Sequence, residues 1–293
     1  MVKRRLALNK FLLSISAFLA IAYVGICVSL LFWQNHLIFF PAQTISFTPK
    51  SLGMVYEDIW LEVGEGESLH GWWLPANSET KGVLLYLHGN GGNVSDNLEH
   101  ARRFQQMGFS VFIFDYRGYG YSEGDFPTEA QVYKDAGIAW DYLVKTRQIE
   151  PQNIFLYGHS LGGAIAIDLA VKQPEIAGLI VQGSFTSMKD MSVVRKEYRL
   201  FPNFLVHQEF DSMSKIENLK MPVLVIHGTS DGTVPHTMSE ELYEALLVPK
   251  QLYLVPNAGH NDLATVAGPQ YQQKIKEFVE LIVSPRSEQD YIF

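Results

Sequence analysis

Hydrophobic and polar positions follow three patterns along the chain. An uncharged apolar run of 23 residues, Phe11 to Trp33, comes first. Residues 54–63 and 68–75 then alternate apolar and polar side chains, which is typical of an antiparallel hairpin with one buried face. Later apolar runs are short and continuous, which favours strands buried on both faces of a parallel sheet. These runs are 82–89, 109–116, 153–160, 177–184, 222–228 and 251–257.

Amphipathic stretches separate these runs and predict helices at about 95–107, 128–147, 161–173, 238–247 and 268–283. The alternation predicts an α/β domain with a mostly parallel sheet and helices on both faces. Residues 185–220 interrupt it, because they mix aromatic, Met and charged residues without a strong strand. We expect a small cap-like insertion over the carboxyl edge of the sheet, where such folds bind ligands. An ordinary helical excursion is the alternative.

The apolar run at 11–33 is long enough to cross a bilayer, for which roughly 20 apolar helical residues suffice. The nearby positive charge lies before it, at Lys3, Arg4, Arg5 and Lys10, and the next basic residue is Lys50. This asymmetry predicts a transmembrane signal anchor whose N-terminus is cytoplasmic. The catalytic domain would then lie on the periplasmic or another extracytoplasmic side.

The predicted division of the chain is a basic N-terminus at 1–10, the anchor at 11–33, a connector at 34–50 and one large domain at 51–293. A signal peptide cleaved after Ala22 is an alternative, although eleven further apolar residues follow that site. Lipid modification of Cys27 is a weaker alternative than the signal peptide, because Ile26 stands where a small residue is expected. A buried core helix is the remaining alternative, and 23 uncharged residues behind a basic cluster disfavour it.

Composition excludes several classes of function. The net charge is -8 and the body has no run of Lys or Arg, so we expect no nucleic-acid partner. Cys27 is the single cysteine, which excludes an internal disulfide, a cysteine metal site and a cysteine nucleophile in the body.

The stretch Gly158-His159-Ser160-Leu161-Gly162 fits the G-x-S-x-G pattern of a nucleophile elbow. It lies between a predicted buried strand and a predicted helix, so the Ser160 hydroxyl would stand above the sheet edge. Glycines on both sides of Ser160 would allow the tight turn to pack closely. A helix N-cap serine is the alternative, and it does not explain both glycines.

A serine nucleophile needs a base, and the base needs an orienting carboxylate. Asp231 follows one predicted strand and His260 follows the last, so both would emerge at the same sheet edge as Ser160. The order Ser, Asp, His is that of α/β-hydrolases. Of the nine histidines, only His260 has this position. We expect His227 to hydrogen-bond loop backbone.

Two backbone N–H groups are expected to stabilise an oxyanion. Leu161 follows the nucleophile, and Asn90 lies in "HGNGGN" (88–93), which follows a predicted strand. A phosphate loop is excluded because no G-K-[ST] follows. For Asp115 and Arg117 we expect a structural role, an ion pair and a turn that shape the site.

The motifs "LHGNGGN", "FDYRGYGYSEG", "GHSLGG", "HGTSDGTVP" and "AGHNDL" together resemble the α/β-hydrolase superfamily, and within it the membrane-anchored Bem-type and serine aminopeptidase-like hydrolases. The resemblance covers roughly 37–283. It implies an eight-stranded, mostly parallel sheet, a catalytic triad of Ser160, Asp231 and His260, and hydrolysis of esters, thioesters or amides without a metal or cofactor.

Carboxylic-ester or thioester hydrolysis is our leading hypothesis. The predicted anchor and the Met-containing cap favour a small-molecule or lipid-like acyl substrate. An aminopeptidase or amidase is the first alternative, with Glu209 or Asp211 as candidate anchors for a substrate amine. A membrane-tethered scaffold without activity is the second. The oligomeric state is left open.

Overall fold

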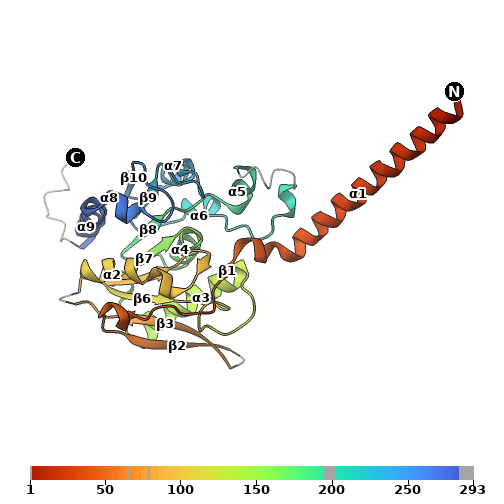
Figure 1. Cartoon of the computed structure of the whole chain (residues 1–293). Helices are drawn as coiled ribbons and strands as arrows, with labels where there is room; N and C mark the ends of the chain where they lie inside the picture. The colour runs from red at the N-terminus through yellow and green to blue at the C-terminus, as the bar shows by residue number, and fades with distance from the viewer. Residues whose placement is uncertain (1, 65, 78–79, 195–201, 284–293) are drawn as a thin grey trace.

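The computed structural model describes residues 2–64, 66–77, 80–194 and 202–283, and its centre is an eight-stranded sheet (Figure 1). The strand order is β10-β9-β8-β7-β4-β6-β3-β2. β3 pairs antiparallel with β2 and β6, and the other neighbours pair in parallel. The strands are β2 (Glu57–Gly64), β3 (Glu67–Leu74), β4 (Val83–Leu87), β6 (Ser110–Phe114), β7 (Ile154–His159), β8 (Gly178–Gln182), β9 (Val223–Gly228) and β10 (Lys250–Val255). The predicted fold class is confirmed.

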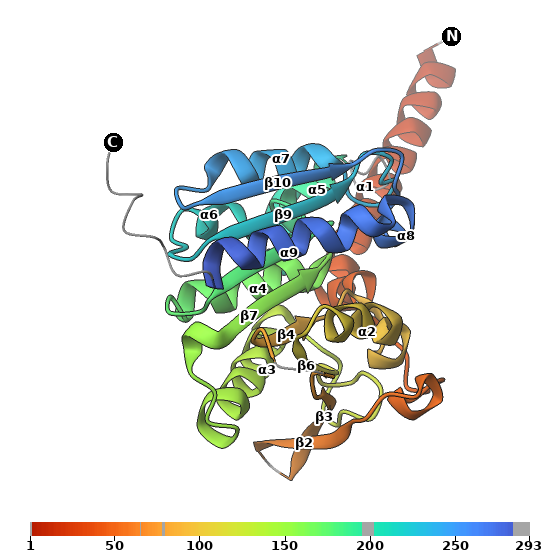
Figure 2. The same ribbon diagram turned by 90° about the vertical axis from the view of Figure 1, so that its left-hand side faces the viewer.

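Helices cover both faces of the sheet, as predicted. One core contains residues of α3 (Glu129–Asp141), α4 (Leu161–Lys172) and α7 (His236–Ala245). The other contains residues of α2 (Leu98–Gln106), α8 (Leu263–Ala267) and α9 (Pro269–Val283), and Figure 2 looks onto this side. The short helix α8 has no counterpart among the predicted elements.

The continuously apolar strands are explained by these two cores. In β4, Leu85 and Leu87 point into the α3/α4 core, whereas Leu84 and Tyr86 point into the α2/α9 core. Successive side chains of a strand alternate between faces, so a strand covered on both faces needs apolar residues at every position.

Helix α1 (Val2–Ile38) projects away from the body as one unbroken helix (Figure 1). Its most apolar 18-residue window has a mean hydropathy of 2.4 and is 0% buried. The helix is therefore not a core helix of the domain, which removes that alternative. Its length and composition suit a membrane span, and a signal sequence has the same properties.

The chain after α1 inserts into the body. Ile38 and Phe39 are buried, and β1 (Phe40–Pro41) pairs in parallel with β5 (Gly91–Gly92). Phe40 N–H donates to the Asn90 carbonyl at 2.8 Å, and Ala42 N–H to the Gly92 carbonyl at 3.0 Å. The aperiodic sequence of this segment did not predict the pairing. It fixes the end of α1 to the loop that follows β4.

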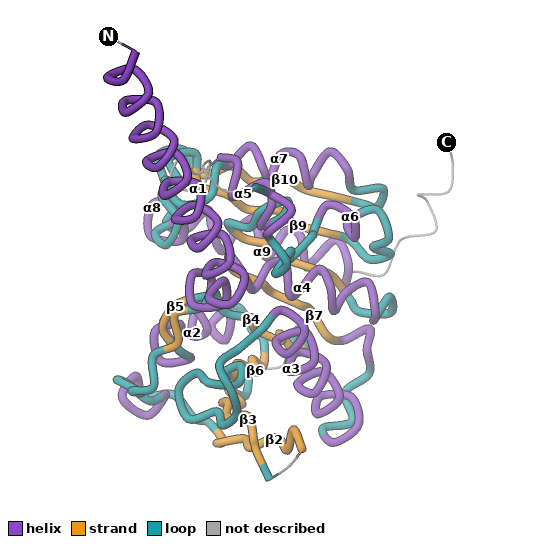
Figure 3. Tube along the Cα trace, turned by 90° about the vertical axis from the view of Figure 1, so that its right-hand side faces the viewer, coloured by secondary structure: helices purple, strands orange, loops and turns teal. Residues whose placement is uncertain are grey.

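The segment expected to form a cap contains α5 (Met188–Val194), a 3-10 turn (Asn203–Leu205) and α6 (Met213–Ile216). The described part of this segment forms no strand, and its 3-10 turn contacts the body end of α1, the helix that runs away from the body in Figure 3. Residues 195–201 of the segment and 284–293 of the predicted domain lie outside the described residues. The predicted domain limits stay predictions.

Candidate active site

Ser160 lies at the sharp turn between β7 and α4, with φ 55° and ψ -119°. A non-glycine residue in this region typically costs about 1–3 kcal/mol. The turn is held by the Ser160 N–H, which donates to the Gln182 carbonyl at 2.8 Å. A Cβ at Gly158 would lie 2.2 Å from the Gly162 carbonyl oxygen, and one at Gly162 would lie 2.0 Å from the Leu87 carbonyl oxygen. Both positions therefore require glycine.

The structure brings Ser160, His260 and Asp231 together at the carboxyl ends of β7, β9 and β10. The Ser160 Oγ lies 2.9 Å from His260 Nε2, and His260 Nδ1 lies 2.6 Å from Asp231 Oδ2. His260 can thus accept the serine proton at one nitrogen while the carboxylate orients the other. This is the geometry that an activated serine needs.

Asp231 is held as a carboxylate by several donors. Its side chain is fully buried, and its Oδ1 accepts from the N–H groups of Thr233 and Val234 at 2.7 and 2.9 Å. Burial opposes ionisation, but hydrogen bonds from His227 and His260 outweigh it and hold the pKa of Asp231 below its ordinary range. The carboxylate therefore remains charged at neutral pH.

The sequence predicted only one of the hydrogen-bond partners of His227. Its Nε2 lies 3.0 Å from the Val234 carbonyl, which is the expected kind of backbone contact. The same nitrogen lies 3.1 Å from Asp231 Oδ2, which was not expected. Its Nδ1 lies 2.6 Å from the Ser239 hydroxyl. Two acceptors at Nε2 place the proton there and leave Nδ1 to accept from Ser239. The only signal in the sequence was its position four residues before Asp231.

His159, next to the nucleophile, packs against His260 rather than joining the serine. Its Nε2 lies 3.2 Å from the His260 carbonyl oxygen, and the two rings are 5.0 Å apart. Burial, followed by the proximity of His260, lowers the pKa of His159 to about 4. His159 is therefore neutral at physiological pH and adds no positive charge beside His260.

The loop after β4 orients the amide of Asn90. His88 Nδ1 donates to the Gly89 carbonyl at 2.7 Å. In the trans peptide between Gly89 and Asn90, the Asn90 N–H points away from this carbonyl and therefore away from the His88 ring. Asn90 is anchored by its own carbonyl, which accepts from the Tyr119 hydroxyl at 2.7 Å, and by Nδ2, which donates to the Ile38 carbonyl at 2.7 Å. Leu161 begins α4, so its N–H has no acceptor within the helix.

Comparison with known proteins identifies the family. The model of the family described as "Serine aminopeptidase, S33" matches residues 78–216, and that of "PhoPQ-activated pathogenicity-related protein" matches 201–291. An uncharacterized protein of Mycobacterium tuberculosis is 34% identical over 268 residues, 91% of this chain and 94% of its own. The protein bem46 of Schizosaccharomyces pombe is 35% identical, over 79% of each chain. The α/β-hydrolase domain-containing protein WAV2 of Arabidopsis thaliana is 31% identical, over 92% of this chain and 94% of its own.

This chain is an α/β-hydrolase. Its relatives place it with the Bem-type and serine aminopeptidase-like members. Solved structures show the same fold: an esterase of Pyrococcus furiosus has a TM-score of 0.66 at 20% identity and covers 83% of this chain and 99% of its own. A puromycin-hydrolyzing peptidase of Mycobacterium tuberculosis has a TM-score of 0.65 at 18% identity, over 80% of this chain and 40% of its own.

In this hydrolase, Asp115 and Arg117 support the loops around the serine. Arg117 forms a buried ion pair with Asp135 at 2.5 Å. Asp115 accepts from the Val94 N–H at 2.8 Å and lies 3.4 Å from His88 Nε2. Burial raises the pKa of Asp115, although His88 opposes the shift. An ion pair was expected here, and the structure gives Asp135 as the partner of Arg117.

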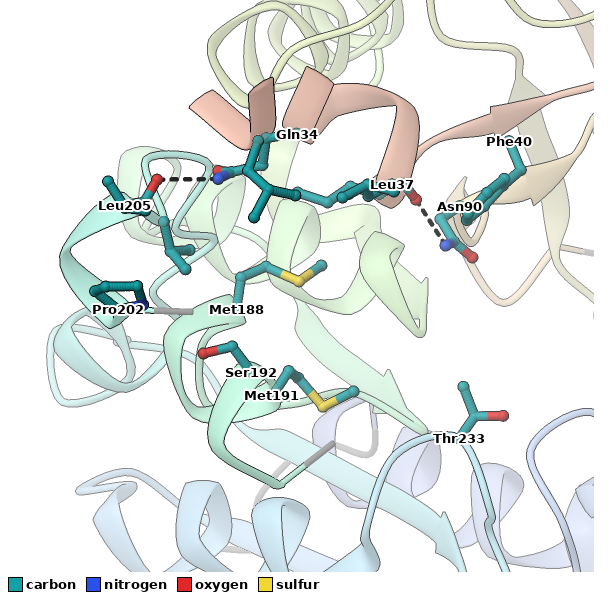
Figure 4. A pocket seen from close by; sticks show the side chains of 13 residues that line it. Gln34, Leu37, Phe40, Asn90, Met188, Met191, Ser192, Pro202, Leu205 and Thr233 are labelled. Atoms are coloured by element: carbon teal, nitrogen blue, oxygen red, sulfur yellow. Dashed lines mark hydrogen bonds between the residues drawn. The ribbon is translucent and has the colours of Figure 1, made fainter. Parts of the chain in front are cut away.

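Two cavities of the hydrolase border each other, and one of them contains Ser160. A polar cavity of about 780 Å³ is lined by Ser160 and His260 and also by Asp96, Glu99 and Arg103. An apolar cavity of about 340 Å³ lies between α1 and the cap, lined by Leu30, Leu37, Ile38, Met188, Met191 and Leu205 among others (Figure 4). Asn90 and Thr233 line both cavities. The two cavities therefore share a border at these two residues.

The acidic residues suggested as amine anchors are engaged elsewhere in the hydrolase. Glu209 pairs with Lys189, and Asp211 accepts from the Ser214 N–H at 3.0 Å. Neither is among the residues that line the two cavities. In the described part of the chain, no group of three or more His, Cys, Asp or Glu residues is arranged to hold a metal ion.

Proposed function

We propose that this protein is a membrane-anchored serine hydrolase that cleaves carboxylic esters or thioesters. The observation that carries the proposal is the distance of 2.9 Å between Ser160 Oγ and His260 Nε2, with the serine at a strained turn. Membership of the α/β-hydrolase family and an esterase among the similar structures support it.

The first half of the proposed reaction acylates the enzyme. His260 Nε2 takes the proton of Ser160 as Oγ bonds to the acyl carbon, and the carbonyl oxygen becomes an oxyanion. The N–H groups of Asn90 and Leu161 donate to this oxygen, and one such donor is typically worth about 3–4 kcal/mol in the transition state. The bond to the leaving group then breaks, and the imidazolium returns the proton to the departing alcohol or thiol.

The second half releases the acid. A water molecule gives a proton to His260 and attacks the acyl carbon of the acyl-serine. The tetrahedral species collapses, the bond to Ser160 Oγ breaks, and the proton returns to the serine. Asp231 remains ionised in both halves and stabilises the imidazolium, consistent with its lowered pKa.

Labelling with a fluorophosphonate probe tests the active serine. The detergent-solubilised wild type should be labelled, and Ser160→Ala should not. Ser230→Ala, at an exposed serine of the loop before Asp231, is the matched control and should be labelled as wild type is. Absence of labelling in folded wild type would contradict the proposal and favour a scaffold without activity.

A serine aminopeptidase or amidase is the second candidate, and the description of the matching family favours it. Such an enzyme needs an acidic group near the serine to bind a free amine. The engagement of Glu209 and Asp211 outside both cavities argues against those two anchors. Hydrolysis of aminoacyl amides with a free amine, without hydrolysis of simple esters, would establish this alternative.

We further propose that α1 crosses the membrane with its N-terminus in the cytoplasm and the hydrolase domain outside. The exposed, apolar surface of the helix and the basic residues at its start support this topology. Protease added to intact spheroplasts should digest the domain and leave the N-terminus protected. The opposite protection pattern would reverse the topology, and release of the domain into the soluble fraction would indicate cleavage of a signal peptide.

A further inference from the structure

The end of α1 forms part of the wall beside the active site. Leu30, Gln34, Leu37 and Ile38 recur at the spacing of one helix face, and all four line the apolar cavity. The opposite wall comes from α5 of the cap, through Met188 and Met191 (Figure 4). A helix suited to lie in lipid thus continues, without a break, into one side of a cavity in the hydrolase domain.

Gln34 joins this helix to the cap. Its Nε2 donates to the Leu205 carbonyl at 3.0 Å, and its Oε1 accepts from the N–H groups of His207 and Gln208 at 2.9 and 2.8 Å. One side chain therefore satisfies three backbone groups of the cap. Gln34 thus ties α1 to residues 205–208 of the cap, at the border of the cavity.

The apolar cavity borders the polar cavity, which contains Ser160, at Asn90. The Asn90 side chain is tied to the Ile38 carbonyl at the end of α1, and its amide belongs to the proposed oxyanion site. Thr233, two residues after Asp231, lies on the same border. A substrate that crosses this border would have its carbonyl carbon beside Ser160, one end in the apolar cavity and the other in the polar cavity.

We propose that the apolar cavity is an acyl-chain subsite, and that the substrate is an amphiphilic ester delivered from the bilayer along α1. This inference rests on the proposed serine hydrolase activity and names its substrate class. The aliphatic chain lies between α1 and α5, and the polar leaving group lies in the polar cavity near Asp96, Glu99 and Arg103.

The size of the cavity sets the expected chain length. If a methylene group takes a volume similar to the roughly 30 Å³ of a water molecule, 340 Å³ holds on the order of ten methylene groups. Each methylene removed from water is worth up to about fourfold in kcat/KM. The value of kcat/KM should therefore rise steeply from the acetate ester to about the decanoate or dodecanoate ester and then level off.

The test uses the full chain in phosphatidylcholine nanodiscs with 4-methylumbelliferyl acetate, octanoate and dodecanoate. The ratio of kcat/KM for dodecanoate to that for acetate should exceed about 100 in wild type. Met191→Trp fills the cavity and should lower this ratio at least tenfold. Val193→Trp, an exposed residue of the same helix that does not line the cavity, is the matched control and should leave the ratio unchanged.

Surface dilution tests delivery from the bilayer. Adding phosphatidylcholine at a constant total amount of the dodecanoate ester lowers its density in the bilayer and should lower the rate, whereas acetate hydrolysis should not change. An unchanged rate on dilution would overturn delivery along α1.

The outcomes separate the two proposals. A flat chain-length profile in a protein that hydrolyses acetate and is labelled at Ser160 would overturn the acyl subsite and leave the hydrolase proposal in place. An equal fall of the dodecanoate-to-acetate ratio in Met191→Trp and Val193→Trp would also overturn the acyl subsite and leave the hydrolase proposal in place. Absence of both ester hydrolysis and Ser160 labelling would overturn both.

Discussion

His227 and His260 both direct a ring nitrogen at the same oxygen of Asp231, at 3.1 and 2.6 Å. The aspartate is therefore shared between the proposed catalytic base and a second, fully buried imidazole on β9. His227 is a positioning residue, because it acts on the reaction only through Asp231.

His227→Phe removes one donor from a charged acceptor, an interaction worth about 1.5–3 kcal/mol. We expect kcat for ester hydrolysis to fall roughly 10- to 100-fold with little change in KM. His227→Gln keeps an N–H donor and should recover part of the loss. Steady-state kinetics check the prediction, with His236→Gln, at a half-buried position outside both cavities, as the control. A loss confined to KM, or no rescue by Gln, would contradict it.

Asp231→Asn should reduce kcat by about 10³- to 10⁴-fold, because the amide no longer fixes His260 in the reactive tautomer. The Asn side chain also brings an NH₂ group close to the N–H donors of His227, Thr233 and Val234, where the wild-type carboxylate offers only acceptors. We therefore also expect a lower melting temperature, measured by circular dichroism. A variant that is fully stable and nearly fully active would show that the carboxylate is not the orienting group.

Gly162→Ala should destabilise the folded protein, because its Cβ would lie 2.0 Å from the Leu87 carbonyl oxygen. Over-packing of this kind typically costs about 1–3 kcal/mol, and the elbow would move. Gly137→Ala is the control: no atom lies within 4 Å of its Cβ, and in α3 it should stabilise by about 0.5–1 kcal/mol. Chemical denaturation of both variants measures the difference. Equal stabilities would contradict the close packing at the elbow.

The folded state should lose stability as the pH falls from about 6.5 to about 4. Burial lowers the pKa of His100 and lowers that of His159 to about 4, so both stay neutral in the folded protein. The unfolded chain, with ordinary histidine pKa values near 6.5, binds these protons first, and stability therefore rises with pH across this window. Melting temperatures from pH 7.5 to 4.5 check the sign. His159→Asn should flatten the curve, and an unchanged slope would contradict the assignment.

The sequence predicted six of the eight strands of the central sheet from continuous apolar runs, which are typical of a parallel sheet covered on both faces. It predicted β2 and β3 from the alternation of apolar and polar residues. Ser160, Asp231 and His260 could likewise be placed at one sheet edge, since each follows a predicted parallel strand. Their catalytic roles stay a proposal until the serine is tested.

Contacts between distant segments could not be predicted in the same way. The pairing of Phe40 with Gly91 involves two-residue strands that have no period, and Gln34 meets the Leu205 backbone across 171 positions of sequence. Both contacts depend on where α1 enters the body, which no local pattern encodes. The second imidazole at Asp231 was missed because His227 lies within a strand that reads as ordinary core.

Under the membrane anchoring that we propose, the unbroken course of α1 has a mechanical consequence for the enzyme. Since no loop separates the helix from β1, the domain cannot swing freely on a tether. Each residue inserted in the apolar stretch would lift the domain by about 1.5 Å and rotate it by roughly 100° about the helix axis. In the proposed topology, the register of this one helix would therefore set both the height of Ser160 above the lipid and the direction that the cavity faces.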